Sequence, residues 1–529
     1  MSSGEQSYLE SGSQQKREQR PVPGTSRLQT HALSALSQRA LLREMGRPAI
    51  EFKRRWFNWG QMRCVAHGVG ALIAASGAPA GAPVALVARN HPNAVAALLG
   101  LIAQGYTIRM IYAFQSAAAI ARDVGRLKPA VVVAGAAEFS DPLRAVLHER
   151  GIAGVALDEM DASCAPGFAR SNSGDLAIPS APRIEILTSG TTGPPKHFAV
   201  TYDLIAQHHV GDSLLHSVDD DPDQQRLSPA ILFFPLGNIS GIYSTIPTML
   251  RGRRALLLDR FNIPDWHDYV LRFRPESGGL PPAGVQMVLD ANIPAADLAC
   301  IRYLSTGAAP LDPTAQRAFE ERYGIPILLS YGATEFGGPV AAMTAELFPE
   351  WGKKKFGTVG RPLPGTHLRV IDPGTGVVLP PGVEGILEVI CPRIGPEWIR
   401  TADVAVIDED GFLFHRGRAD GAIIRGGFKL LPESIERALV LHEAISAAGV
   451  VGIADKRLGQ VPAAVIQLKP GFIEPTIAEL EAHLRNELPA THIPVAWRFV
   501  AALPRNRSVK VDRPALRKLF ESESHANIG

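Results

Sequence analysis

The chain has little of several features that mark large classes of protein. Its 529 residues include only four cysteines, whose wide spacing excludes a CxxC zinc site and a disulfide framework. The formal net charge is +2, so neither nucleic acid nor an anionic membrane surface is expected as a partner. No apolar run approaches the roughly 20 residues of a membrane helix, and the N-terminus lacks the apolar stretch of a signal peptide. These absences predict a cytoplasmic protein without an integral membrane segment. The cysteines are Cys64, Cys164, Cys300 and Cys391.

The length and the changing texture of the chain predict several domains. Residues 1–27 are polar and charged and are expected to be a disordered tail. Residues 28–418 are expected to form a large N-terminal domain of two βαβ-type subdomains, because strand-like and helix-like runs alternate there. Its part at about 356–415 is rich in Pro and Gly and predicts a small β-barrel-like subdomain. Residues 419–529 predict a small α+β C-terminal domain, so the fold class is α/β multidomain. The clearest strand-like runs are 83–90, 130–135, 230–236, 301–307 and 325–332, and 94–105 is the clearest buried helix.

A loop rich in glycine and hydroxyl groups lies between two strand-like runs. Its backbone N–H groups and hydroxyls are typical of an anion-binding concavity, and a following lysine adds positive charge for phosphate oxygens. The spacing is not that of a Walker A loop. On these residues alone, a solvated hairpin turn stays an open alternative. The loop consists of Thr188, Ser189, Gly190, Thr191, Thr192, Gly193 and Lys196.

Four later stretches add groups that suit a nucleotide. The small residues of 305–311 allow close approach of a flat ring, and 330–338 offers an aromatic ring, a hydroxyl and a carboxylate suited to Mg²⁺. Asp403 and Arg418 suit a ribose, and a basic loop at 503–518 contains Lys510. Taken singly, each has a plainer alternative: a core tyrosine at Tyr331, a surface ion pair, or a solvated lysine.

Together and in this order, the motifs resemble those of the adenylate-forming superfamily, which comprises acyl- and aryl-CoA synthetases, peptide-synthetase adenylation domains and beetle luciferases. LTSGTTGPPK resembles its phosphate loop, and YGATE, RTADVAVIDEDGFLFHRGRAD, RGGFKLLPESIE and KVDR resemble its later motifs. The resemblance covers about residues 35–518. It implies an AMP-forming acid–thiol ligase that uses ATP, Mg²⁺ and coenzyme A. A carboxylic acid would become an acyl-AMP with release of pyrophosphate, and thioester formation would then release AMP.

The resemblance also implies a role for each matching position. The loop at 188–196 would bind the β- and γ-phosphates, Thr334 the α-phosphate, and Glu335 the Mg²⁺. Asp403 and Arg418 would hold the ribose, while Lys510 would bridge the substrate carboxylate and the α-phosphate. Adenine would lie among Gly307, Ala308, Ala309, Tyr331 and Gly332. In a mobile C-terminal domain, Asp420 would be the hinge, and Gly426 and Gly427 would line the pantetheine tunnel.

The expected acid pocket lies between GNISGIYS and FGGPVAAM. Its composition lacks an acid to pair an ammonium group, which disfavours an amino acid, and its paired glycines favour a bulky aryl, fatty or alicyclic acid. A purely backbone role for these glycines is the alternative. The pocket consists of Asn238, Ile239, Ile242, Phe336, Gly337, Gly338, Pro339 and Val340. Asn238, Ala402 and Val509 depart from the family pattern, where a histidine and two glycines are usual.

The sequence leaves two other functions open. A free-standing enzyme of this kind would load the acyl group onto a carrier protein instead of coenzyme A. A degenerate member would bind nucleotide or acyl ligand as a non-catalytic sensor, although the retained Lys196, Glu335, Asp403, Arg418 and Lys510 argue against it. The expected partners are a small carboxylic acid, ATP and coenzyme A, and the expected state is a monomer or homodimer.

Overall fold

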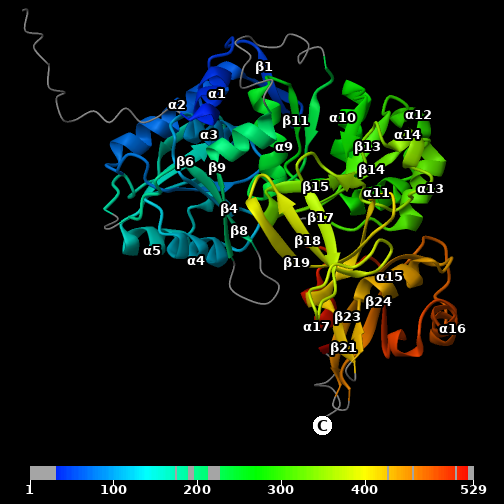
Figure 1. Cartoon of the computed structure of the whole chain (residues 1–529). Coiled ribbons are helices and arrows are strands. Elements are labelled where there is room, and N and C mark those ends of the chain that lie inside the picture. The colour runs from blue at the N-terminus through cyan, green and yellow to red at the C-terminus, as the bar shows by residue number, and fades with distance from the viewer. Residues whose placement is uncertain are drawn as a thin grey trace, which may run out of the picture. The chain divides into compact units, whose positions relative to one another are not determined.

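The computed structural model describes residues 31–172, 176–188, 196–211, 227–425, 428–455, 458–506 and 509–521 (Figure 1). The expected disordered tail lies outside these ranges. Within them, no helix combines the length and apolar character needed to cross a bilayer.

A seven-stranded sheet forms the first part of the chain, and its central strands are parallel. Every residue of β3 (Val84–Ala88) is buried, because helices cover both faces of the sheet. Helix α3 (Pro92–Ala103) is buried along its whole length. The strand and the buried helix predicted here are therefore confirmed. The order is β7 (Asp161–Cys164), β6 (Ala153–Asp158), β5 (Val131–Gly135), β3, β4 (Ile108–Tyr112), β8 (Arg183–Thr188) and β9 (Lys196–Thr201), and the covering helices also include α1 (Ala32–Leu41), α2 (Trp59–Ala75), α4 (Ala117–Leu127) and α5 (Asp141–Arg150).

Two further sheets complete the βαβ-type region. One has parallel strands β12, β13 and β14 followed by antiparallel β15 and β16, and the other has the order β10-β11-β1-β2. Their strands are β12 (Ser277–Gly279), β13 (Tyr303–Thr306), β14 (Ile327–Ala333), β15 (Gly338–Ala342), β16 (Arg361–Pro362), β10 (Ala230–Leu232), β11 (Ala255–Leu257), β1 (Pro48–Phe52) and β2 (Arg55–Asn58). The helices are α9 (Ile239–Leu250), α10 (Ile263–Phe273), α11 (Pro282–Asp290), α12 (Ala295–Leu298), α13 (Pro313–Tyr323) and α14 (Phe348–Trp351).

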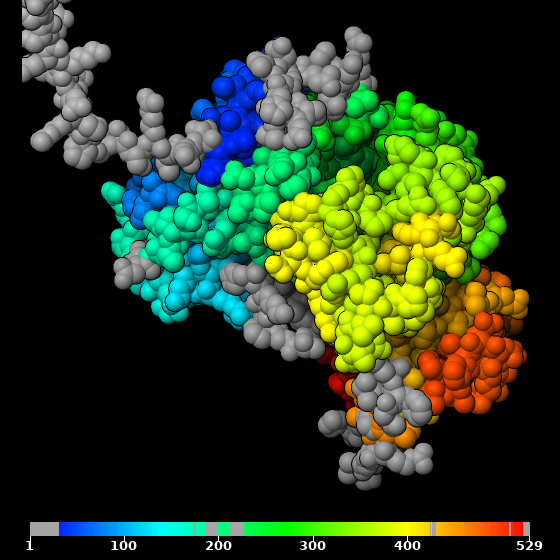
Figure 2. Space-filling view, viewed as in Figure 1, coloured from blue at the N-terminus to red at the C-terminus, as the bar shows by residue number. Residues whose placement is uncertain are grey.

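The β-rich part is a four-stranded antiparallel meander of β17 (His367–Ile371), β18 (Gly385–Cys391), β19 (Gly395–Ile407) and β20 (Leu413–Arg418). Its strands follow the chain order, and within the described ranges no pairing of β17 with β20 closes a barrel. Apolar residues of β18–β20 pack against the β14–β15 region in one core. In Figure 2, the yellow residues of the meander accordingly lie beside the green residues of that sheet.

The last part of the chain forms a separate sheet of order β22-β21-β24-β23, with β25 parallel to β24. The elements are β21 (Ile423–Arg425), β22 (Phe428–Leu430), α15 (Pro432–Val440), β23 (Ile445–Asp455), β24 (Gly459–Leu468), α16 (Ile477–Glu487), β25 (Ala496–Val500) and α17 (Arg513–Glu521). The loop predicted over 503–518 is wrong from Arg513 onward, where α17 begins. Asp512 begins this helix by accepting the Ala515 N–H at 3.0 Å, and Pro514 suits its first turn.

Candidate active site

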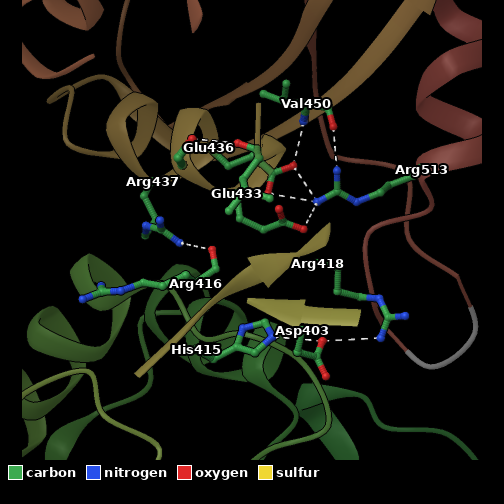
Figure 3. Close-up of polar contacts among 11 residues, drawn as sticks. Asp403, His415, Arg416, Arg418, Glu433, Glu436, Arg437, Val450 and Arg513 are labelled. Atoms are coloured by element: carbon green, nitrogen blue, oxygen red, sulfur yellow. Dashed lines mark hydrogen bonds and ion pairs between the residues drawn. The ribbon is translucent and has the colours of Figure 1, made fainter. Parts of the chain in front are cut away.

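A buried carboxylate organises one group of the predicted site residues. Asp403 on β19 is 6% exposed and lies directly opposite Arg418 on β20. The Tyr331 hydroxyl donates to Oδ2 of Asp403 at 2.5 Å. Arg418 Nη1 lies 3.4 Å from Oδ1 of the same carboxylate (Figure 3). The fold thus brings Tyr331 to Asp403, which lies 72 positions later in the sequence, and to the neighbouring Arg418. The burial of Asp403 also argues against the alternative of a surface ion pair.

The surroundings of Asp403 favour its ionised form. Burial alone would raise the pKa of this carboxyl, but a hydrogen bond and charge from His415, with Tyr331 and Arg418, hold it below the ordinary range. The same burial and the Asp403 charge raise the pKa of the Tyr331 hydroxyl well above its ordinary value. Asp403 is therefore an anionic acceptor at neutral pH, as a ribose site requires, while Tyr331 is a neutral donor.

His415 is a member of this group that the sequence analysis did not assign. Its Nε2 lies 3.3 Å from Oδ1 of Asp403 and must donate, because a carboxylate oxygen can only accept. It faces Asp403 because Arg416 is an extra residue in β20: Val404 pairs with Gly417, and Ala405 pairs with His415. Gly417 has φ +143°, a conformation for which glycine is suited. That glycine is the single sequence signal of the bulge.

The segments expected around adenine are tightly built. A Cβ on Gly307 would lie 2.5 Å from Oγ of Ser330, and one on Gly332 would lie 2.4 Å from the Gly338 carbonyl oxygen. Neighbouring Ala308 has φ +66°. The Tyr331 ring is buried at 9% exposure and belongs to a hydrophobic core, which agrees with the alternative of a core tyrosine as well as with a base platform. These contacts explain why the two positions are glycine.

The expected metal position fits a hard cation that keeps its waters. Thr334 and Glu335 lie on the 3₁₀ turn η3 (Thr334–Phe336), where Glu335 is exposed. No group of three or more His, Cys, Asp or Glu side chains in the described ranges could hold a metal ion. A single exposed carboxylate fits Mg²⁺ shared with phosphates and water and does not fit an all-protein cage.

Lys510 lies on a tight turn close to Arg418. Its N–H donates to Oδ1 of Asn506 at 3.1 Å, and its carbonyl accepts the Asn506 N–H at 2.7 Å. The residue as a whole is exposed, yet protein atoms crowd its ammonium group. This desolvation, and after it the charge of Arg418, lowers the pKa of Lys510. An anion placed between the two cations would relieve their repulsion.

The turn carries backbone strain at Val509. Its φ is +62°, in the left-handed region that a β-branched residue rarely adopts. Val509→Gly is expected to raise the free energy of unfolding of this part of the chain by up to about 1 kcal/mol, because relief of strain exceeds the entropic cost of glycine. Hydrogen exchange of the β23 and β24 amides measures the change. Val511→Gly, at ordinary φ, is the control and should destabilise, and equal destabilisation by both would contradict the prediction.

A residue that the sequence analysis missed lies beside the segment expected to line the acid pocket. Gly337 and Gly338 have φ of +66° and +137°, so the backbone itself requires glycine there. A Cβ on Gly338 would lie 3.2 Å from the Tyr243 ring, which occupies the space beside this glycine. Ile239, Ile242, Phe336 and Val340 are buried, whereas Asn238 and Pro339 are half-buried. The width of any pocket here therefore depends on Tyr243.

Two buried polar side chains also form hydrogen bonds to backbone carbonyls of residues 336–339. His209, on the π-helix η2 (Ile205–Val210), donates from Nε2 to the Gly337 carbonyl at 2.7 Å. Burial, then the charge of Arg393, lowers the pKa of His209 to about 4, so it is neutral at pH 7. Arg393 is 8% exposed and donates to the Phe336 carbonyl at 2.9 Å and to that of Pro339. Among the described residues, no carboxylate forms a salt bridge with Arg393.

Several predicted positions lie outside what the structure describes. These are Ser189, Gly190, Thr191, Thr192 and Gly193 of the phosphate loop, Gly426 and Gly427, and the side chains of Thr188, Lys196 and Asp420. The strands on either side of the loop, β8 and β9, pair antiparallel, with Thr188 opposite Lys196. The two strands expected on either side of the loop are therefore confirmed.

Comparison with known proteins identifies the family. The profile of the AMP-binding enzyme family matches residues 37–395, and that of its C-terminal domain matches 434–510. The 2-succinylbenzoate–CoA ligase of Bacillus mycoides is 30% identical over 361 residues, 64% of this chain and 70% of that protein. The sulfoacetate–CoA ligase of Cupriavidus necator is 28% identical over 480 residues, which cover 86% of this chain and 91% of that protein.

Solved structures agree in fold. ATP-bound MatB from Rhodopseudomonas palustris aligns with a TM-score of 0.76 at 23% identity, covering 93% of this chain and 99% of that one. The anthranilate CoA ligase AuaEII in complex with anthranoyl-AMP aligns with a TM-score of 0.75 at 19% identity, and the alignment covers 94% of this chain and 98% of that one. The resemblance drawn from the motifs is confirmed, and so is the α/β multidomain class. The chain belongs to the AMP-binding enzyme family, within the adenylate-forming superfamily.

Proposed function

We propose that the protein is an AMP-forming acid–thiol ligase that activates a bulky apolar carboxylic acid and transfers it to coenzyme A. The observation that carries the proposal is the buried, ionised Asp403 held between Tyr331 and Arg418, with Lys510 near Arg418. A ribose site built on Asp403 and Arg418, with the Lys510 cation near it for the α-phosphate, is an arrangement that lets a carboxylate approach ATP.

The chemistry proceeds in two displacements. A carboxylate oxygen of the acid attacks the α-phosphorus of ATP, and pyrophosphate leaves with the electron pair of the broken P–O bond. The thiolate of coenzyme A then attacks the acyl carbonyl, and AMP leaves. Lys510 offsets the charge that gathers on the α-phosphate in the first step, while Asp403 and Arg418 hold the ribose. Mg²⁺, held by Glu335, would neutralise the leaving pyrophosphate. We further propose that residues 419–529 move as a domain about Asp420 between the two steps.

The acid is placed between α9 and the Phe336–Val340 segment. Apolar walls from Ile239, Ile242 and Phe336 favour an aryl, fatty or alicyclic body. A second candidate class is an acid with a further anionic group, because Arg393 is a buried cation beside this segment. Two relatives are named as ligases of 2-succinylbenzoate and sulfoacetate, and both of these acids carry two acidic groups.

Transfer to coenzyme A is favoured over loading of a carrier protein or a sensor role, because the relatives are CoA ligases. The four cysteines of the structure are free, which suits a reducing cytoplasm. We propose a monomer or homodimer in that compartment.

The test is pyrophosphate release from ATP and Mg²⁺ with a panel of acids, in the presence and absence of coenzyme A. The panel pairs each apolar acid with an analogue that carries a second carboxylate. We expect acid-dependent pyrophosphate, and a thioester once coenzyme A is added. Pyrophosphate without a thioester would favour the carrier-loading alternative. No turnover of any acid by a protein that still binds ATP would favour the sensor. If the protein prefers the acid with two carboxylates in each pair, and Arg393→Met loses this preference, the substrate is an acid with a second anionic group and not a purely apolar acid.

A further inference from the structure

His415 touches both side chains on which the proposed nucleotide site depends. Its Nε2–H donates to Oδ1 of Asp403 at 3.3 Å, and its ring stacks on that of Tyr331 with centroids 5.7 Å apart and planes at 29°. Tyr331 in turn donates to Oδ2 of Asp403 at 2.5 Å. Each of the three side chains therefore contacts the other two. Figure 3 shows His415 and Arg418 approaching Asp403 from different directions.

The bulge in β20 allows His415 to reach Asp403. In a regular strand, His415 and Arg418 would point to opposite faces, because their positions differ by an odd number of residues, three. The extra residue Arg416 returns His415 to the face of Asp403, since Ala405 and Asp403 share a face and His415 pairs with Ala405. The strand thus departs from regular pairing to aim a second donor at one carboxylate.

We propose that His415 is a positioning residue of the nucleotide site, which fixes the Asp403 carboxylate so that it accepts a ribose hydroxyl. The inference depends on the proposed function. A carboxylate has about four directions for accepting hydrogen bonds. Tyr331, His415 and Arg418 use three, and the remaining one is left for the ribose. Because donors hold both oxygens, the carboxylate loses little freedom when ATP binds.

Packing alone does not explain the residue type. A phenyl ring at position 415 would stack on Tyr331 as an imidazole does, but it would leave Oδ1 of the buried Asp403 without this donor. An ionised carboxylate out of contact with water depends on such donors. The N–H group, and not the ring, is therefore the part of His415 that acts on the site.

The experiment compares His415→Phe and His415→Gln with the unaltered protein, using calorimetry with ATP and with 2′,3′-dideoxy-ATP. His415→Phe keeps the ring and loses the donor, while His415→Gln keeps a donor and loses the ring. We expect His415→Phe to raise the Kd for ATP about tenfold, the size of one hydrogen bond to a charged group. The Kd for the dideoxy nucleotide should change less than about twofold, because it has no hydroxyl for Asp403. His415→Gln should recover most of the affinity for ATP. His148→Phe, at an exposed position of α5, is the control and should match the unaltered protein.

The outcomes separate the two proposals. An equal loss of affinity for both nucleotides in His415→Phe would mean a structural role and would overturn the inference. Unchanged or tighter ATP binding by His415→Phe would also overturn it, since His415 would then be neutral or obstructive. If the unaltered protein binds no ATP, the proposed function fails, and the inference fails with it.

Discussion

Lys510→Ala is expected to slow acid-dependent pyrophosphate release by at least about 10²-fold, because it removes a cation from the charge that develops at the α-phosphate. The thioester-forming step, started from a pre-made acyl-adenylate, should change by less than about threefold, since Lys510 would act in the first step alone. Single-turnover assays of the two half-reactions measure both rates. Lys510→Arg keeps the charge and should retain more activity than the alanine variant.

The pH dependence provides a second check on the same residue. Desolvation and the charge of Arg418 lower the pKa of Lys510. The side chain is positively charged below its pKa and loses that charge as the pH rises through the pKa. The kcat/KM for adenylation should therefore fall on the alkaline side at a lower pH than an ordinary lysine would give. Lys518→Ala, at an exposed position of α17, should change neither the rate nor this profile. Equal slowing of both half-reactions in Lys510→Ala would refute its assignment to the first step.

Local patterns in the sequence were enough to predict the framework of the fold. Strand β3 is a continuous apolar run because α3 and α4 cover its two faces, and such a run is visible without any partner. The order of the motifs gave Asp403, Arg418 and Tyr331, which the fold brings together. The strand and helix predictions are confirmed where a short segment carries its own signal of burial.

The contacts that were missed depend on pairing between distant segments. His209 bonds to a carbonyl 128 positions away, and nothing around it marks that partner. His415 faces Asp403 through a one-residue bulge, for which Gly417 is the sole local sign. The expected loop at 503–518 failed because its basic composition concealed the helix that Asp512 begins. For His209 and His415 the deciding partner lies outside the residue's own neighbourhood in the sequence, whereas the Asp512 cap of α17 is a local signal.

Arg513→Met is expected to lower the stability of the last sheet by about 2–4 kcal/mol, because it removes a cation from between two carboxylates. Arg513 Nη2 lies 3.0 Å from Glu433 and 3.1 Å from Glu436, and Nη1 donates to the Val450 carbonyl at 2.8 Å (Figure 3). Burial, together with the charge of Glu433, already raises the pKa of Glu436, and Arg513 opposes that rise. Hydrogen exchange of the β23 and β24 amides in the whole chain measures the loss.

The pH dependence of the stability loss in Arg513→Met distinguishes the charge of Arg513 from the packing of its aliphatic part. Without Arg513, the folded pKa of Glu436 moves further above its unfolded value, so the folded state binds more protons and its stability falls as the pH rises above the ordinary range of a glutamate. The loss in Arg513→Met should therefore be smaller at mildly acidic pH than at neutral pH, and adding Glu436→Gln should recover part of it. Arg517→Met removes from the same helix an arginine that donates to the Gly452 carbonyl, and it should show neither effect. A loss that is the same at both pH values would mean that the aliphatic part of Arg513, and not its charge, supports this sheet.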